Sequence, residues 1–377
     1  MEYHIEGRDH NARAGVLGTD HGPIHTPAFM PVGTQASVKA LSPRELVEIQ
    51  TSVILCNTYH LYLRPGADVI RRSGGLHRFM GWDKPILTDS GGYQVFSLSA
   101  LRKIEEEGVQ FRSHVDGSVH RFTPESVVDI QRQLGSDIVM VLDECTPYPC
   151  TEEYARNSND LTVRWATRSR SRFAGSGPLY QHNQSLFAIV QGSVYPEIRE
   201  RSVRALIEMD FDGYGIGGLA VGEPADAMMQ IVSLCAGLLP EEKPRYLMGV
   251  GTPANLLDGI ERGIDLFDCV LPTRNGRNGM IFTRTGPINL MNARYKFDLS
   301  PIDEACGCYS CGHFTRAYLR HLFQTKEILG LRLATLHNLY YYQQLMRDAR
   351  NAIMDARFAP WKEEQLQLLD RQESMYA

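Results

Sequence analysis

Two aspartates in apolar surroundings are the clearest candidates for catalytic residues. Asp268 lies within the sequence LFDCV, and Asp89 lies in ILTDSGG, directly before two glycines. A carboxylate can attack an anomeric carbon to form a glycosyl-enzyme intermediate while a second carboxyl group transfers protons. Asp268 is therefore a candidate nucleophile and Asp89 a candidate acid or base. A salt bridge from Asp268 to Arg274 or Arg277, or a helix-capping role for Asp89, would explain the same residues structurally.

Other polar residues and glycines are suited to reading a purine-like base. A buried carboxylate at Asp143 needs a partner and could accept the two donors of an amidine edge. Gln191 could pair with the neighbouring carbonyl, Tyr93 could stack on the ring and Met248 could cover its other face. Glycines allow the backbone to approach a ligand closely. The predicted base-binding residues are Ser90, Gly91, Gly92, Tyr93, Asp143, Gln191, Gly217, Gly218, Leu219 and Met248. Each alone is also compatible with ordinary packing.

Three cysteines crowd into the sequence CGCYSC, namely Cys306, Cys308 and Cys311. Three thiolates and an imidazole form a closed tetrahedral Cys3His site for a structural Zn²⁺ ion. We predict His337, in LATLHNL, as the fourth ligand. His313 and His321 are the alternatives, although His313 follows the last cysteine too closely to complete a tetrahedron easily. The alternative is that the cysteines are unrelated thiols and that the histidine is an ordinary core residue. Three cysteines within six residues make this alternative less favoured.

Short apolar runs that lead to a polar residue or glycine organise the chain. The runs VIL, IL, IVMVL and LFAIV lead to Asn57, Asp89, Asp143 and Gln191. YGIGG, YLMG and LFD follow later in the chain. Runs with little alternation are typical of strands buried on both faces of a parallel sheet. Helical signals lie between them, including the cap-then-proline pairs Ser42-Pro43, Thr123-Pro124 and Thr252-Pro253.

This alternation predicts βα units and a parallel sheet, either doubly wound or closed. The units extend over roughly 250 residues, and polar residues end several strands, which favours a barrel. We therefore predict an α/β protein with a TIM (β/α)8 barrel and a zinc-binding subdomain near the C-terminus. The strand ends of a barrel share one face, so the aspartates and Gln191 should converge on one pocket. The predicted domains are a catalytic barrel over 1–290, a zinc-binding subdomain with helices packed on the barrel over 291–350, and a helical segment over 351–377.

Composition narrows the class of protein. The 377 residues, 43% hydrophobic and 22% charged, are typical of a soluble globular protein. No apolar run reaches the length of a membrane span and the start MEYHIEGRDH is too polar for a signal peptide, so we expect a cytoplasmic protein with no membrane association. The net charge of −5 weakly disfavours a nucleic-acid partner. Basic clusters over 164–172 and 316–326 are most simply solvated helix faces.

The chain resembles the tRNA-guanine transglycosylases in the order and spacing of its motifs: TDSGGYQ at 88–94, DECTP at 143–147, QGS at 191–193, GGLAVGE at 217–223, FDCV at 267–270 and the Cys3His pattern. The resemblance extends from His25 to about residue 350. It implies a TIM barrel with one structural Zn²⁺ ion per subunit, working as a homodimer. It assigns Asp268 as nucleophile and Asp89 as general acid/base. The RNA-contacting positions that it implies are Gly249, Val250, Gly251, Thr252, Pro253, Ala254, Asn255, Thr273, Arg274, Asn275, Gly276 and Arg277.

The resemblance also implies a reaction. A pentosyltransferase of this family exchanges guanine at wobble position 34 of tRNAs with a G-U-N anticodon for the 7-deazaguanine base preQ1, in queuosine biosynthesis. Cys145 and Val221 resemble the bacterial form, which takes preQ1, rather than eukaryotic relatives that take queuine. The chain ends at residue 377 without the extra RNA-binding domain of archaeal relatives. The family commonly has alanine where this chain has Gly276. We expect this difference to affect the stiffness of the loop over 273–277 and not the chemistry.

Two other functions are compatible with parts of the sequence. A non-catalytic RNA-binding partner subunit would share the fold, but such relatives lose the nucleophile that Asp268 provides here. A barrel glycoside hydrolase would also use paired carboxylates. Three tryptophans are few for stacking on sugars, which weakens that alternative.

Overall fold

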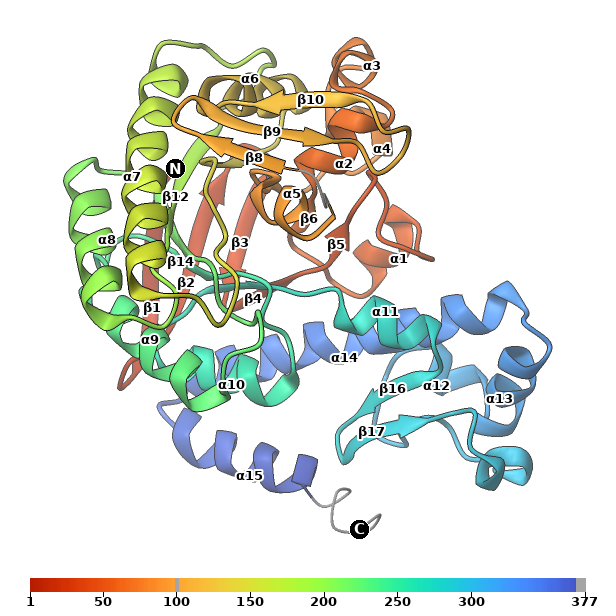
Figure 1. Ribbon diagram of the computed structural model, residues 1–377. Helices are drawn as coiled ribbons and strands as arrows, with labels where there is room; N and C mark the ends of the chain where they lie inside the picture. The colour runs from red at the N-terminus through yellow and green to blue at the C-terminus, as the bar shows by residue number, and fades with distance from the viewer. Residues whose placement is uncertain (99–101, 371–377) are drawn as a thin grey trace.

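The computed structural model describes residues 1–98 and 102–370, and a closed parallel barrel forms its centre (Figure 1). The sheet contains, in spatial order, β4 (Ala28–Met30), β15 (Leu266–Asp268), β14 (Arg245–Leu247), β13 (Gly213–Ile216), β12 (Ser185–Val190), β11 (Ile138–Met140), β7 (Ile86–Thr88), β6 (Ile54–Cys56) and β5 (Val32–Gly33). β4 pairs with β15 and β5 pairs with β6, both in parallel. Pro31 separates β4 from β5, so the two segments act as one strand that closes an eight-stranded barrel. The predicted TIM barrel is confirmed.

The barrel strands form where the sequence has short apolar runs. All six residues of β12 are buried, as are those of β6, β7 and β11. Side chains buried on both faces remove the polar–apolar alternation, as expected for strands covered by helices. The segment that splits around Pro31 was not predicted as a strand, because its two apolar pieces are short and proline interrupts them.

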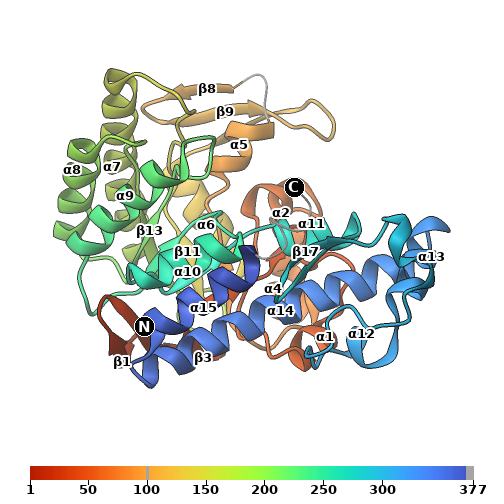
Figure 2. The ribbon, with the colours of Figure 1, turned by 90° about the horizontal axis from the view of Figure 1, so that it is seen from below.

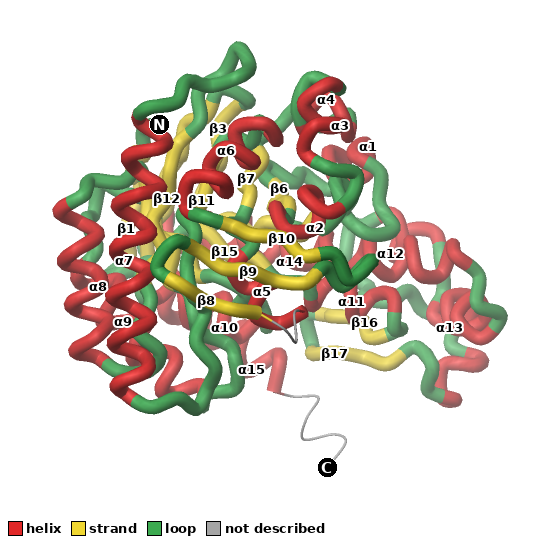
Figure 3. Tube along the Cα trace, turned by 45° about the horizontal axis from the view of Figure 1, so that its top comes forward, coloured by secondary structure: helices red, strands yellow, loops and turns green. Residues whose placement is uncertain are grey.

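Helices surround the strands, as the helices (red) and strands (yellow) of Figure 3 show. The predicted cap-then-proline pairs open α1 (Pro43–Glu48), α6 (Pro124–Leu134) and α10 (Pro253–Glu261). Ser42 and Thr123 form capping boxes, which satisfy free N–H groups of the first turn. The remaining barrel helices are α2 (Thr58–Leu63), α3 (Ala67–Arg72), α4 (Leu76–Met80), α5 (Gly92–Leu98), α7 (Glu152–Ala174), α8 (Pro196–Glu208) and α9 (Ala225–Leu238).

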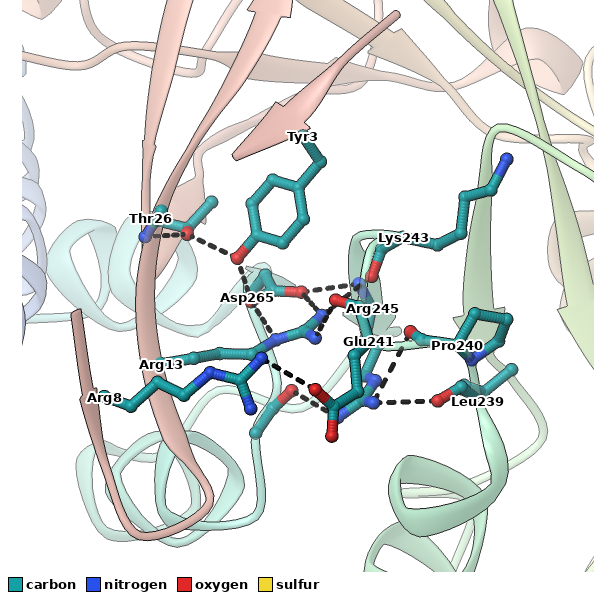
Figure 4. Close-up of polar contacts among 12 residues, drawn as sticks. Tyr3, Arg8, Arg13, Thr26, Leu239, Pro240, Glu241, Lys243, Arg245 and Asp265 are labelled. Atoms are coloured by element: carbon teal, nitrogen blue, oxygen red, sulfur yellow. Dashed lines mark hydrogen bonds and ion pairs between the residues drawn. The ribbon is translucent and has the colours of Figure 1, made fainter. Parts of the chain in front are cut away.

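An N-terminal antiparallel sheet lies at the amino end of the barrel strands. It consists of β1 (Tyr3–Asp9), β2 (Ala12–Thr19) and β3 (Gly22–Thr26). The fully buried Asp265 directly precedes β15 and ties this sheet to the barrel (Figure 4). Its carboxylate accepts hydrogen bonds from Tyr3 Oη at 2.6 Å, Arg13 Nε at 2.8 Å and the Arg245 amide at 2.6 Å. A buried carboxylate needs such donors. This cluster therefore stabilises the end of the barrel where the strands begin, opposite to their carboxyl ends.

A second small sheet interrupts the barrel between α5 and α6. It is formed by β8 (Arg102–Glu105), β9 (Gly108–Arg112) and β10 (Val119–Phe122). Trp165 of α7 donates from its indole N–H to the carbonyl of Glu106 in the β8–β9 turn. The arginines of α7 pair with neighbouring acidic residues: Arg164 with Glu106, Arg168 with Glu125 and Arg172 with Asp129. The cluster over 164–172 is therefore a solvated, ion-paired helix face, as predicted.

The chain after the last barrel strand builds a second core and then returns to the barrel. Its elements are α11 (Leu271–Arg277), β16 (Met280–Thr283), β17 (Gly286–Asn289), the 3-10 helix η1 (Ala293–Phe297), α12 (Tyr309–His313), α13 (Arg316–Gln324), α14 (Ile328–Met354) and α15 (Phe358–Asp370). We call the part from β16 to α13 the C-terminal subdomain. Figures 1 and 2 show α14 running from this subdomain across the barrel. There Tyr342 Oη donates to the Gly251 carbonyl and Gln343 Nε2 to that of Phe29.

The predicted domain boundaries at 290 and 350 stay predictions. The second core already draws on Ile281 and Ile288, while α14 continues through residue 350 and contributes its later residues to the barrel core. The last part of the predicted C-terminal segment, 371–377, lies outside the described residues. No helix in the described ranges is long and apolar enough to span a membrane.

Candidate active site

A cavity of about 340 Å³ opens at the carboxyl ends of the barrel strands. Active sites of TIM barrels lie at this end because the loops after all eight strands meet there. Twelve of the predicted site residues line the cavity: Asp89, Ser90, Gly91, Tyr93, Asp143, Gln191, Gly217, Gly218, Leu219, Met248, Gly249 and Asp268. The structure therefore brings together the two candidate catalytic carboxylates and nearly all of the predicted base-binding residues. The exception, Gly92, lies directly behind the cavity wall.

Asp268, the last residue of β15, is oriented by two hydrogen-bond donors. Its Oδ1 accepts from Tyr246 Oη at 2.6 Å and from the Gly249 amide at 2.7 Å. Burial raises the pKa of Asp268, and these two hydrogen bonds oppose that rise by stabilising the carboxylate. Across the described ranges, no ion pair joins Asp268 to Arg274 or Arg277, so the alternative of a structural salt bridge is wrong. A carboxylate held in this way at a cavity wall is suited to nucleophilic attack.

Asp89 follows β7 and is held by three donors. Asn57 Nδ2 lies 2.5 Å and Gln94 Nε2 lies 3.0 Å from its Oδ2, while the Thr58 amide lies 2.8 Å from Oδ1. Burial, together with the nearby negative charge of Asp268, raises the pKa of Asp89 to about 6 against the stabilising hydrogen bonds. The bond from Thr58 caps the first turn of α2, so the capping explanation holds for a helix earlier in the chain. A carboxyl group with a pKa of about 6 is suited to taking and giving protons near neutral pH.

Asp143 and Gln191 form a polar pair in the same cavity. Gln191 Nε2 donates to Asp143 Oδ2 at 2.7 Å, and Ser90 Oγ donates to Oδ1 at 2.9 Å. Burial raises the pKa of Asp143, and the donors from Gln191 and Ser90 lower it. The Oε1 atom of Gln191 is buried without a hydrogen-bond partner among the described residues. Buried polar atoms are normally paired, so this atom marks a position for a donor on a ligand.

Glycines shape the wall around this pair. A Cβ atom at Gly92 would lie 2.6 Å from the Asp143 carbonyl oxygen and 2.7 Å from its Oδ1. Gly218 has φ +63°, and a Cβ atom there would lie 2.2 Å from Gln191 Oε1. Only residues without a side chain fit these two positions. Tyr93, which is 51% exposed, and Met248 also line the cavity and offer flat or apolar surface to a ring.

The predicted RNA-contacting segments are partly buried. Gly249 and Thr252 are exposed at the loop after β14, and Arg274 is exposed on α11. Ala254, Asn255, Asn275 and Arg277 are half-buried. The side chains or backbone of the other five are packed inside: Val250, Gly251, Pro253, Thr273 and Gly276. RNA contact by these segments stays a prediction, and the buried residues support the backbone of the exposed ones.

The expectation that Gly276 lies in a loop is wrong, because Thr273 to Arg277 belong to helix α11. A Cβ atom at Gly276 would lie 2.9 Å from both the Cα and the N of Thr335 in α14. The glycine therefore allows two helix backbones to approach closely and is a packing feature. Proline at the start and a run without β-branched residues after Thr273 permit the short helix.

The four predicted metal ligands come together where α14, which carries His337, packs on the C-terminal subdomain. Their ligand atoms lie within 4.8 Å of one another. The Sγ atoms of Cys306, Cys308 and Cys311 lie 3.7, 3.4 and 3.2 Å from His337 Nδ1. His337 Nε2 lies 2.8 Å from the Phe282 carbonyl oxygen. A proton on Nε2 leaves the lone pair of Nδ1 free for a metal, which is the usual outer-shell arrangement. These residues can hold a metal ion, and His337 is preferred to His313, whose Nδ1 contacts the Tyr309 carbonyl.

The sequence analysis did not predict three residues that donate hydrogen bonds to the candidate catalytic carboxylates. Asn57 and Gln94 hold Asp89, and Tyr246 holds Asp268. Asn57 ends the apolar run of β6 in the same way as the predicted residues end theirs, so its position was a usable signal. Gln94 lies in the GGYQ motif. Nothing in the sequence around Tyr246 distinguishes it from a core tyrosine.

Known proteins resemble this chain over nearly its full length. The family model described as queuine tRNA-ribosyltransferase matches residues 9–371. A queuine tRNA-ribosyltransferase from Thermoanaerobacter sp. (strain X514) is 57% identical over 354 residues, covering 94% of this chain and 93% of the relative. One from Caldanaerobacter subterraneus subsp. tengcongensis is 56% identical, covering 94% and 93%. One from Thiobacillus denitrificans is 56% identical, covering 95% and 96%. The chain belongs to the queuine tRNA-ribosyltransferase family.

Proposed function

We propose that this protein is a tRNA-guanine transglycosylase, a pentosyltransferase that replaces guanine at position 34 of G-U-N anticodon tRNAs with preQ1 in queuosine biosynthesis. The observation that carries the proposal is the single cavity that holds two carboxylates, Asp268 and Asp89, together with the polar pair Asp143 and Gln191. The carboxylates provide glycosyl transfer and the polar pair provides recognition of a base. We propose a cytoplasmic location, which a tRNA substrate supports.

The proposed reaction consists of two displacements at one carbon. The ionised carboxylate of Asp268 attacks C1′ of the nucleotide, the bond from C1′ to the guanine nitrogen breaks, and guanine leaves with that electron pair and takes a proton from the carboxyl group of Asp89, which is left ionised. The incoming base then loses its ring N–H proton to Asp89 and attacks C1′, which breaks the bond to Asp268. Two inversions retain the configuration at C1′, and the phosphate chain is not cut. Because Tyr246 and the Gly249 amide donate to Asp268, they favour its ionised, attacking form.

Base recognition is assigned to the part of the cavity wall that contains Asp143 and Gln191. Asp143 accepts the two N–H groups of the amidine edge. The second N–H of Gln191 Nε2 and the backbone N–H of Gly218 donate to the ring carbonyl, and Tyr93 and Met248 cover the ring faces. Cys145 lines the cavity, and with Val221 it supports preQ1 rather than queuine as the incoming base. A guanosine in an RNA loop can be turned out of its stack and read on its edges in this way.

The RNA strand is assigned to the rim of the cavity. Arg274 is exposed on α11, directly after the β15 strand that carries Asp268, and Gly249 and Thr252 are exposed on the neighbouring loop. A cation and exposed backbone at this place suit phosphate contacts, which position an RNA without reading its sequence.

We assign the metal site as one structural Zn²⁺ ion per subunit. Tetrahedral zinc with Zn–S of about 2.3 Å and Zn–N of about 2.0 Å separates sulfur from nitrogen by about 3.5 Å, close to the distances between the cysteine sulfurs and His337. Because Cys306, Cys308, Cys311 and His337 would fill all four positions, the ion would stabilise the C-terminal subdomain and leave no open position for a substrate.

The homodimer interface is assigned to exposed apolar side chains of the C-terminal subdomain and of the first turn of α14. Ile328 is 77%, Tyr309 55%, Tyr318 40% and Leu329 39% exposed. Large apolar side chains exposed to solvent are candidates for an interface. Sedimentation analysis should give twice the chain mass at micromolar concentration, and Ile328→Lys should shift that equilibrium towards the monomer. A wild-type monomer would contradict the assignment.

The decisive experiment is incorporation of radiolabelled guanine into unmodified G-U-N tRNA, counted in acid-precipitated RNA. Wild-type protein should incorporate label, and Asp268→Ala should incorporate none and form no covalent RNA adduct. A folded, metal-loaded protein without incorporation would favour the non-catalytic partner subunit. Release of free sugar from oligosaccharides without RNA would favour the glycoside hydrolase.

A further inference from the structure

Arg199 is a buried cation without a carboxylate partner. It lies in the first turn of α8, and its side chain is 0% exposed. The carboxylates of the described residues form no ion pair with it, and burial lowers the pKa of its guanidinium group. Burying a charge without a counter-charge is costly unless its hydrogen bonds are satisfied. A side chain retained under this penalty, close behind a substrate cavity, requires an explanation beyond packing.

Among the described residues, the guanidinium group of Arg199 binds backbone carbonyls alone, and these belong to two cavity loops. Nε donates to Ser193 O at 2.8 Å, and Nη1 donates to Val190 O at 2.9 Å and Gly217 O at 2.8 Å. Nη2 lies 3.5 Å from Gly218 O. Val190 and Ser193 flank Gln191, and Gly217 and Gly218 follow β13. One side chain thus fixes the loop that carries Gln191 to the loop that carries Gly218, which follow β12 (labelled in Figure 1) and β13 (labelled in Figure 2).

The bond to the Gly217 carbonyl also sets the direction of the next amide. The peptide bond between Gly217 and Gly218 is trans, and in a trans peptide the N–H points opposite to the C=O. Because the carbonyl points at Arg199, behind the wall, the Gly218 N–H points towards the cavity that Gly218 lines. A charged donor on the carbonyl polarises the peptide and strengthens the N–H as a donor. The amide is therefore directed and activated by a residue that does not touch the cavity.

We propose that Arg199 is a positioning residue that sets base specificity, by holding the Gly218 N–H and the Gln191 side chain where a carbonyl oxygen of the incoming base will lie. This inference rests on the proposed function and adds the residue that maintains its base-reading wall. It predicts an effect on bases that carry this carbonyl and no effect on bases that lack it. A merely structural role for Arg199 would weaken both kinds of base equally.

The test compares guanine with 2-aminopurine, which keeps the exocyclic 2-amino group but has neither the ring carbonyl nor the N1–H that accompanies it. Each variant is therefore compared with wild type on the same base. Guanine KM, tRNA KM, kcat and the inhibition constant of 2-aminopurine are measured in the incorporation assay for wild type, Arg199→Met and Arg199→Lys. Arg199→Met should raise the KM for guanine at least tenfold, while the 2-aminopurine constant and the tRNA KM change less than twofold. Arg199→Lys keeps the charge without the planar fork and should give an intermediate KM.

Arg132→Met is the matched control. Arg132 is also buried and donates to the carbonyls of Phe173 and Ser176, but it lies outside the cavity wall. It should lower the melting temperature without changing the ratio of the guanine and 2-aminopurine constants. An unchanged ratio in both Arg199 variants, or equal weakening of both bases, would overturn the inference. If Arg199→Met does not fold, the ratio in Arg199→Lys decides. Wild-type protein without any incorporation would instead contradict the proposed function.

Discussion

Replacing Asn57 with alanine should move the acid limb of the pH–rate profile to higher pH. In the proposed reaction Asp89 accepts a proton from the incoming base, so only its ionised form is active in that step, and kcat/KM for the incoming base falls as pH decreases through the pKa of Asp89. That pKa is raised to about 6 by burial and by the charge of Asp268, with Asn57 as the foremost opposing donor. Removing the Asn57 amide, 2.5 Å from Asp89 Oδ2, leaves burial less compensated.

The size of the shift follows from the hydrogen bond that is lost. A hydrogen bond to a charged group contributes about 1.5–3 kcal/mol, and about 1.4 kcal/mol corresponds to one pKa unit. The pKa of Asp89 should therefore rise by about one to two units in Asn57→Ala. Ionisation of Asp89 at pH 6 then falls roughly 5- to 50-fold, whereas at pH 9 the variant and wild type should be nearly equally ionised.

The assay is kcat/KM for guanine incorporation between pH 5 and pH 9, with saturating tRNA. Gln94→Ala is the graded control, because its amide lies farther away, at 3.0 Å, and should give a smaller shift. A uniform loss of rate at every pH, with the acid limb in its original place, would refute the assignment of that limb to Asp89.

Three further substitutions test the metal site and the packing around the cavity. Cys308→Ser should reduce bound zinc from about one ion per chain to nearly none and lower the melting temperature, as measured by mass spectrometry of the metal and calorimetry; full zinc content would contradict the ligand assignment. Gly276→Ala forces a Cβ atom against Thr335 at 2.9 Å, so urea unfolding should show a loss of about 1–3 kcal/mol, and unchanged stability would show that α11 can move away. Gly92→Ala places a Cβ atom 2.7 Å from Asp143 Oδ1 and should raise the guanine KM at least tenfold with little change in the tRNA KM; an unaltered guanine KM would remove Asp143 from base recognition.

Much of the barrel could be predicted because local sequence carries the signal. Apolar runs buried on both faces fix the strands, and proline after a capping residue fixes the helix starts. The strand split by Pro31 could not be predicted, because its two short segments become a strand only by pairing with β15 on one side and β6 on the other. Likewise, the segment around Gly276 becomes a packed helix through contact with α14.

The sequence by itself determined which residue types stand at the strand ends and which four side chains can bind a metal. These features depend on residue identity and on spacing within a short stretch of chain. Only the tertiary structure decided what surrounds each group: Asn57 against Asp89, Tyr246 against Asp268 and Arg199 behind Gly218. The physical reason is that hydrogen bonds and burial set the pKa and direction of a group, and both come from neighbours distant in sequence.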